Sequence, residues 1–287
     1  MNRITPSRRA FYCLIFLIAS IFPTHVQAQM DTNQHIEYLS EINLVGKGQQ
    51  RDVMMLPEIV GTKINAGKKN SLVVLDQVNN VVVNNSMRQI LAKVPGMQIW
   101  ESDGSGIQIG IANRGLSPNR SWEFNIRQNG ADISADPFGY PEAYYNPQMQ
   151  AVQRIQIIRG AGALQYGPQF GGMLNYALKR ETKKPFSFES QNTVGSYGLM
   201  SSFNAIGGKH NKFSYYIYNH SRSGDGWRDN SQYSVRNTHA FIAYDFTKKT
   251  KLSAEYTSMD YKMQQAGGLT DNQFKNNPQQ SYRERNW

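Results

Sequence analysis

Cysteine is nearly absent from this sequence of 287 residues. Cys13 is the only one, and it lies in an apolar run close to the N-terminus. A disulfide framework is therefore excluded for the chain that follows that run. The histidines after residue 28 show no metal-ligand spacing. They are His35, His210, His220 and His239.

Catalytic patterns are also missing. The sequence has no nucleophile elbow, no phosphate-binding loop and no pair of acids at a recognisable spacing. Asp132 and Asp136 stand four residues apart, but their surroundings favour loop and turn positions over an acid–base pair. We therefore predict that the protein is not an enzyme, and that it has no catalytic residues, no cofactor and no metal site of its own.

Long apolar runs do not occur after residue 28. A helix that crosses a bilayer needs about 20 apolar residues. If this part of the chain sits in a membrane, it must do so as a barrel, because a barrel is the other structure that satisfies all its backbone groups internally.

Acidic residues are outnumbered by basic ones, 21 against 31, which gives a formal charge of +10. This balance favours anionic partners, namely an anionic solute, lipid headgroups or nucleic acid. Lysine and arginine are scattered, however, and no basic helix appears. We therefore expect no nucleic-acid partner.

The first 28 residues have the pattern of a secretion signal. Arg3, Arg8 and Arg9 precede an apolar run over 11–22, and Val26-Gln27-Ala28 supplies a site for signal peptidase. The run of about 12 residues is too short to span a bilayer. We predict a signal peptide over 1–28 and export of the rest.

The next two segments differ in character. Residues 29–53 are polar and predict a flexible extension, whereas 54–184 mix helix and strand patterns. The run 86–94 predicts a short helix, with Ser86 as its cap and Pro95-Gly96 at its end. Short strand candidates lie at 72–75, 78–83, 97–100, 107–111, 124–127 and 152–159.

Residues 185–287 alternate between apolar and polar positions. Strands are predicted at 186–194, 197–205, 213–221, 235–246 and 251–261, with short turns at 195–196, 207–211 and 247–250. Strands of about ten residues with this alternation are typical of a transmembrane barrel. A soluble β-sandwich is the alternative, but its strands are usually about 5–6 residues long. The secretion signal favours the barrel.

Four motifs in order resemble the plug domain of TonB-dependent outer-membrane receptors. They are VPGM at 94–97, NRGL at 113–116, NGADI at 129–133 and VQRIQIIRG at 152–160, the last continued by GALQYG at 162–167 and GGMLNY at 171–176. The third stands where the family has DGVP, so that Asn129 replaces the usual acid. The resemblance implies an α+β plug domain over 54–184, followed by the first strands of an antiparallel transmembrane β-barrel over 185–287.

Within that family the sequence is most similar to ferric-citrate receptors. The likeness rests on residues 114–121 (RGLSPNRS), 137–141 (PFGYP), 166–169 (YGPQ) and 226–228 (GWR). It implies solute contacts from plug and barrel loops, and the candidates are Asn119, Arg120, Asp136, Phe138, Tyr140 and Arg228. Arg114 and Arg159 are predicted to form ion pairs with barrel carboxylates, with anion binding as the alternative.

The resemblance also implies a partner for the extension. An extended segment can pair with the sheet of another protein. Glu41, Ile42, Asn43, Leu44 and Val45 are our candidate for the TonB box, and 57–61 is the competing one. Few residues precede the first candidate, so we expect a transporter without a signalling domain.

These inferences predict TonB-dependent uptake of a ferric chelate across the outer membrane, with ferric citrate as the leading solute. The expected partners are TonB with its energising complex, the chelate and outer-membrane lipid. Haem, cobalamin, a glycan or a peptide remain alternative solutes. A passive porin or adhesin and a secreted enzyme are the alternative classes. A barrel that encloses a plug needs around 22 strands, so we expect the barrel here to be incomplete.

Overall fold

The computed structural model describes residues 53–60, 63–65, 70–77, 81–134, 143–167, 169–180 and 184–283, all within one compact unit over 44–287. The predicted signal peptide lies outside these residues. So do the first TonB-box candidate and all of the predicted extension except Val53.

The described residues between 53 and 180 fold as a mixed α and β domain, here called the N-terminal domain. Its central sheet has the order β3-β8-β9-β6-β7, in which β6 and β9 are parallel and the other pairs antiparallel. The strands are β3 (Ser71–Val74), β6 (Phe124–Gln128), β7 (Ala131–Asp132), β8 (Val152–Ile158) and β9 (Gly172–Leu178).

Two further antiparallel pairs belong to this domain. β1 (Ile59–Val60) pairs with β2 (Lys63–Ile64), and β4 (Met97–Glu101) pairs with β5 (Ile109–Asn113). The strands predicted at 97–100, 107–111, 124–127 and 152–159 are thus confirmed within two residues at each end. In the run 78–83 the described residues, 81–83, lie outside any strand.

The predicted helix is present but shorter than expected. α2 (Met87–Leu91) has Ser86 at its N-cap, yet the Ser86 side chain makes no capping bond. Instead, Glu101 of β4 accepts the Arg88 backbone N–H at 3.0 Å and the Ser86 hydroxyl at 3.0 Å. The cap that the sequence assigned to Ser86 is therefore supplied by a carboxylate from a distant strand.

The predicted apolar face of this helix is confirmed, because Met87, Ile90, Leu91 and Val94 are all buried. They pack with side chains from the central sheet into one core. Burying each such side chain contributes roughly 1.5–3 kcal/mol. The domain also has short 3-10 turns, η1 (Leu75–Gln77), η2 (Asn119–Ser121), η4 (Met149–Ala151) and η5 (Gly160–Tyr166).

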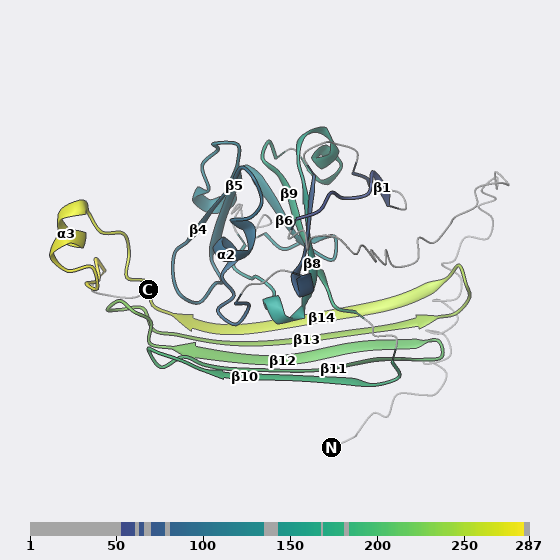
Figure 1. Ribbon diagram of the computed structural model, residues 1–287. Helices are drawn as coiled ribbons and strands as arrows, with labels where there is room; N and C mark the ends of the chain where they lie inside the picture. The colour runs from purple at the N-terminus through teal and green to yellow at the C-terminus, as the bar shows by residue number, and fades with distance from the viewer. Residues whose placement is uncertain are drawn as a thin grey trace, which may run out of the picture. The chain divides into compact units, whose positions relative to one another are not determined.

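Residues 187–263 form a second antiparallel sheet, here called the long-stranded sheet. Its strands follow one another in chain order and curve together (Figure 1). Among the described residues the sheet is open, with β10 and β14 each paired on one side only. The strands are β10 (Ser187–Val194), β11 (Met200–His210), β12 (Phe213–Gly224), β13 (Tyr233–Asp245) and β14 (Lys251–Met263).

The alternation predicted for this sheet is confirmed, and the burial shows what each face carries. One face exposes apolar side chains, among them Phe186, Phe188, Val194, Ile242, Tyr244, Phe246, Leu252 and Tyr256. The other face is buried and holds polar and aromatic groups, among them Phe203, Tyr218, His220, Arg222, Asn237 and His239. An apolar outer face with a polar inner face is the pattern of a transmembrane barrel wall.

Two predicted turns in this sheet are wrong in position. β11 continues to His210, so 207–210 lie in a strand rather than in a turn. Close neighbours, rather than a turn, account for Gly207 and Gly208. A Cβ on Gly207 would lie 2.9 Å from the Tyr216 ring, and a Cβ on Gly208 would clash with the Pro185 carbonyl. β11 also begins at Met200 rather than at Tyr197. Tyr197 and Gly198 take positive φ, and the turn closes with the Gly195 N–H donating to the Leu199 carbonyl at 2.9 Å.

A short helix, α3 (Asp271–Asn276), follows β14 and begins with a capping box between Thr270 and Gln273. None of the helices in the described part of the chain has the length and apolar character needed to cross a membrane.

Candidate functional site

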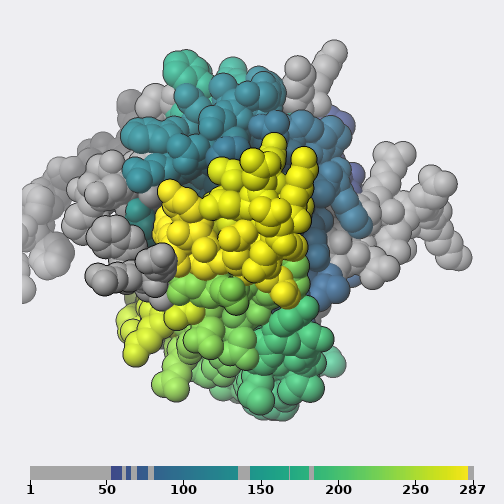
Figure 2. Space-filling view, turned by 90° about the vertical axis from the view of Figure 1, so that its left-hand side faces the viewer, coloured from purple at the N-terminus to yellow at the C-terminus, as the bar shows by residue number. Residues whose placement is uncertain are grey.

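A cleft of about 820 Å³ lies between the N-terminal domain and loops of the long-stranded sheet. Trp100 and Glu101 of β4 form part of its lining, together with Asn119 and Arg120 of η2. The sheet contributes Arg228 from the loop after β12, and Gln265, Gly267, Gly268 and Arg283 from the segment after β14. Figure 2 shows this last segment in yellow against the blue surface of the N-terminal domain.

Positive charge dominates the cleft. Its lining includes Arg88, Arg120, Arg228 and Arg283, and Glu101 is the single acidic residue of the lining among the residues that the structure describes. A concave surface lined by charge of one sign concentrates ligands of the opposite sign. The cleft therefore suits an anion.

Glu101 is occupied by its own neighbours. Its carboxylate accepts the Ser86 hydroxyl and the Arg88 N–H, and the Arg88 Nε lies 3.7 Å from Oε2. The Glu101 side chain is 14% exposed, against 72% for Arg88. The carboxylate thus caps the helix terminus, and the other described arginines of the lining are Arg120, Arg228 and Arg283.

Two of the predicted solute contacts, Asn119 and Arg120, lie in the cleft on a well-anchored turn. The Ser121 hydroxyl holds this turn against β5, because it accepts the Ile111 N–H at 2.9 Å and donates to the Ile109 carbonyl at 3.2 Å. Arg120 has a φ of 56°, so its backbone is left-handed. Such positions are uncommon for residues other than glycine and persist where the surroundings fix them.

Arg228, a third predicted contact, also lines the cleft but is engaged in holding loops together. Its two Nη atoms donate to the carbonyls of Gly267 and Gln280, at 2.6 and 2.7 Å. It thus shapes the cleft and supplies charge to it. The other predicted contacts, Asp136, Phe138 and Tyr140, lie outside the described residues.

Sequence reasoning missed most of the other cleft residues, among them Arg88, Trp100, Glu101 and Arg283. Trp100 is 57% exposed although it lies on a strand, and such an exposed aromatic next to arginines can pack against a ligand. No local sequence pattern predicts that these four residues line the cleft. They meet because β4 pairs with β5 and the chain after β14 returns to the N-terminal domain.

Arg114 and Arg159 were predicted to form ion pairs with carboxylates of the sheet. The described bonds of the Arg159 side chain stay within the N-terminal domain, to the Pro95 carbonyl at 2.9 Å and the Ser71 hydroxyl at 2.8 Å. Burial, and then the charge of Arg114, lower the pKa of Arg159. Arg114 is exposed, and no ion pair between it and a carboxylate is found among the described residues.

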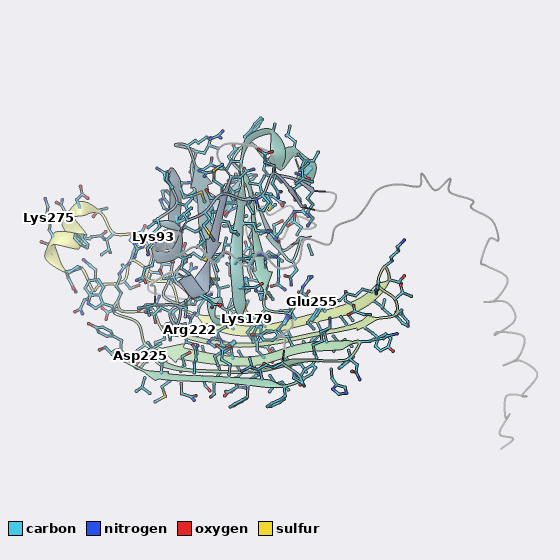
Figure 3. The ribbon with its side chains drawn as sticks, turned by 45° about the vertical axis from the view of Figure 1, so that its right-hand side comes forward. Lys93, Lys179, Arg222, Asp225, Glu255 and Lys275 are labelled. Carbon is cyan, nitrogen blue, oxygen red and sulfur yellow. The ribbon has the colours of Figure 1, made fainter. Side chains whose placement is uncertain are left out.

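Other residues bind the N-terminal domain to the sheet, as Figure 3 shows for Lys179, Arg222 and Glu255. Lys179 pairs with Glu189 of β10 at 3.1 Å, and Arg180 pairs with Glu255 of β14 at 3.4 Å. The charges thus have the predicted signs, but they come from the end of the N-terminal domain.

Arg222 of β12 makes the most buried of these contacts and is 2% exposed. Its guanidinium donates to the carbonyls of Val83, at 2.8 Å, and Ser105, and it lies 5.6 Å from the centre of the Tyr233 ring. Here the arginine belongs to the sheet and the acceptors to the N-terminal domain, which reverses the predicted arrangement. The Ser105 loop follows directly after Glu101 and Ser102, which line the cleft.

Asp103 lies in the same loop. Its carboxylate accepts the Ser105 N–H at 2.6 Å and also the Ser105 hydroxyl. Burial raises the pKa of Asp103, while these two bonds and the Arg222 charge oppose the rise. The loop beneath the cleft is thus tied internally and to the sheet.

The competing TonB-box candidate at 57–61 is partly engaged in the fold. Ile59 and Val60 pair with Ile64 and Lys63. The preceding Leu56 is buried. Among the described residues, no group of three or more histidine, cysteine, aspartate or glutamate side chains is placed to hold a metal ion.

Residues 65–173 match the family model described as the TonB-dependent Receptor Plug Domain. Over these residues the N-terminal domain is similar to the plug domain of TonB-dependent receptors, and it is called the plug from here on. The motifs at 94–97, 113–116, 129–133 and 152–160, on which the resemblance was based, all fall inside the matched range.

Solved receptors share the fold of the plug and the sheet. The copper transporter OprC matches with a TM-score of 0.57 and 15% identity, over 70% of this chain and 32% of its own. The siderophore receptor PirA from Pseudomonas aeruginosa gives 0.53 and 16%, over 68% and 34%. The pyoverdine receptor FpvA from Pseudomonas aeruginosa PAO1, solved with pyoverdine, gives 0.55 and 16%, over 69% and 28%.

The chain thus spans about a third of the length of these receptors. The predicted fold class, an α+β plug followed by antiparallel barrel strands, is confirmed. At these identities the likeness concerns the fold and leaves the solute to be argued from the cleft.

Proposed function

We propose that the protein acts as a TonB-dependent receptor of the outer membrane and takes up an anionic metal chelate. The observation that carries the proposal is the cleft between plug and sheet loops, whose described lining has four arginines and one carboxylate that is already bonded. The apolar outer face of the sheet suits lipid. OprC, PirA and FpvA are described as a copper transporter, a siderophore receptor and a pyoverdine receptor, which supports a metal-linked solute.

Ferric citrate is our leading candidate for this solute. Its carboxylates would accept hydrogen bonds from guanidinium groups, which bind carboxylates in paired geometry. Arg120 and Arg283 both line the cleft, the first from the plug and the second from the segment after β14. A solute held between them would bring the two parts of the protein into one site.

Uptake would then depend on TonB rather than on any chemistry of this protein. TonB pairs with an extended segment, for which residues 41–45 remain our first candidate, and a pull on that segment moves the plug. The strand pairing of 59–60 leaves the competing segment less free to join another sheet.

Uptake of radiolabelled ferric citrate tests the proposal in cells that make the full-length receptor, with and without TonB. We expect accumulation only when both are present. Accumulation without TonB would refute energy coupling. Failure of ferric citrate to compete against haem, cobalamin or ferric siderophores would reassign the solute.

Trp100 provides a direct signal of binding. We expect a ferric chelate in the cleft to quench tryptophan fluorescence, and a Trp100→Phe variant to lose most of that quenching, because Trp100 is exposed in the cleft lining. Trp122→Phe is the matched control, since Trp122 is 58% exposed but does not line the cleft. Equal quenching in both variants would place the solute elsewhere.

A further inference from the structure

One carboxylate on β14 collects hydrogen bonds from a turn of the plug. The Asn129 Nδ2 donates to both oxygens of Glu255, at 2.8 and 3.0 Å. The Gln128 Nε2 donates to Oε1 of the same carboxylate at 2.9 Å. Figure 3 labels Glu255 on β14, on the side of the sheet toward the plug. Two neighbouring amides of the β6–β7 turn thus hold a single acid of the sheet.

Arg180 completes the set of donors. Its Nη2 lies 3.4 Å from Oε2 of Glu255, and its guanidinium packs over the Phe241 ring at 5.2 Å. The Glu255 side chain is 25% exposed. All these donors belong to the plug or to the segment that leaves it, so the carboxylate is used for holding the plug.

The two amides are oriented by bonds inside the plug. The Asn129 Oδ1 accepts the Leu178 N–H at 3.0 Å, which leaves Nδ2 directed at the sheet. The Gln128 Oε1 accepts the Tyr145 hydroxyl at 2.6 Å, which leaves Nε2 for Glu255. Burial raises the pKa of Tyr145 to about 12, so the phenol remains a donor.

The backbone of the turn also suits asparagine. Asn129 and Gly130 have φ values of 50° and 90°, which fits a two-residue hairpin turn with both central residues left-handed. Aspartate tolerates this backbone as well, but it would face Glu255 with a second carboxylate. The replacement of the usual acid by Asn129, noted in the sequence, thus has a partner that explains it.

We propose that Gln128, Asn129 and Glu255 form a catch that seats the plug on the sheet. Its carboxylate lies on β14, whereas Arg222 lies on β12, and its two donors in the turn region are neutral amides. That it must open during transport rests on the proposed function. That it seats the plug does not, and the two statements are tested separately.

Exchanging the hydrogen-bond donor and acceptor between residues 129 and 255 tests the proposal. In Asn129→Asp two carboxylates face each other, and we expect backbone hydrogen exchange over 126–133 to rise by at least about tenfold in the purified full-length receptor, without solute or TonB. In the double variant Asn129→Asp/Glu255→Gln the amide introduced on β14 can donate to the carboxylate introduced in the turn. We expect its exchange to return to within about threefold of the wild type.

Asn211→Asp is the matched control. Asn211 also has a left-handed backbone, with φ 52°, in the turn between β11 and β12, and its Nδ2 contacts His210 rather than a carboxylate. We expect it to leave exchange over 126–133 unchanged. Exchange in Asn129→Asp equal to that control, or no recovery in the double variant, would overturn the catch.

Glu255→Ala covers the case in which Asn129→Asp does not fold. It leaves the turn intact and removes its acceptor, so faster exchange over 126–133 is again expected, and unchanged exchange would refute the proposal. Chelate uptake by the double variant is read out separately. Loss of uptake with normal exchange would concern the transport step and leave the seating of the plug intact.

Discussion

An Arg222→Met variant is expected to lose about 2–5 kcal/mol of plug stability, one of the two largest effects that we predict. Methionine keeps most of the length of the side chain but removes both donors to the carbonyls of Val83 and Ser105. Each buried acceptor left without a partner costs about 1–3 kcal/mol. The methionine also removes the positive charge near Asp103.

Chemical unfolding of the purified full-length receptor, followed at the plug by hydrogen exchange, measures this loss. Arg236→Met is the control, because Arg236 lies on the neighbouring strand β13 and is exposed. An exposed substitution of this kind changes stability by about 0.5 kcal/mol or less. Equal stability of the two variants would show that the Arg222 contacts contribute nothing net.

Reversal of charge in the cleft is expected to have the second large effect, this time on binding. Arg120→Glu replaces a guanidinium on an anchored turn by a carboxylate that repels an anionic chelate. Loss of one hydrogen bond to a charged group costs about 1.5–3 kcal/mol. This corresponds to a dissociation constant that is roughly 10- to 100-fold larger.

Titration with ferric citrate at two salt concentrations checks this result. The wild type should bind less tightly at the higher salt, because ions screen the attraction. The variant should lose both affinity and much of that salt dependence. Arg154→Glu, an exposed arginine of β8 outside the cleft lining, is the control. Binding that is insensitive to Arg120→Glu but sensitive to the control would remove the cleft from the proposed function.

Much of the fold could be predicted because it depends on local patterns. The alternation of Phe186 and Phe188 with polar neighbours fixes which face of a strand is apolar, and the spacing of Met87, Ile90 and Leu91 fixes the face of a helix. The positions of turns were less accessible. Glycine occurs both where a chain turns and where a neighbour approaches closely, and Gly207 belongs to the second kind.

The site was predictable only in part, for a related reason. Asn119 and Arg120 could be found because they stand in a recognisable motif. Arg222 and Glu101 could not, since their partners are backbone groups or distant side chains. A backbone carbonyl such as that of Val83 has no signature in the sequence, so a contact made to it becomes visible only when the fold places it.

The composition of the plug's contact with the sheet has a thermodynamic consequence. Ala151 of the plug joins the small apolar cluster on the inner face, whereas buried Gln148 and Gln150 of the plug and Asn237 and His239 of the sheet are polar. Exposure of apolar surface raises the heat capacity and exposure of polar surface lowers it. Moving the plug away from the sheet should therefore change the heat capacity little, whereas unfolding the plug core should raise it strongly. The free energy of plug displacement would then change almost linearly with temperature, whereas the free energy of unfolding the plug core would follow a curve with a maximum.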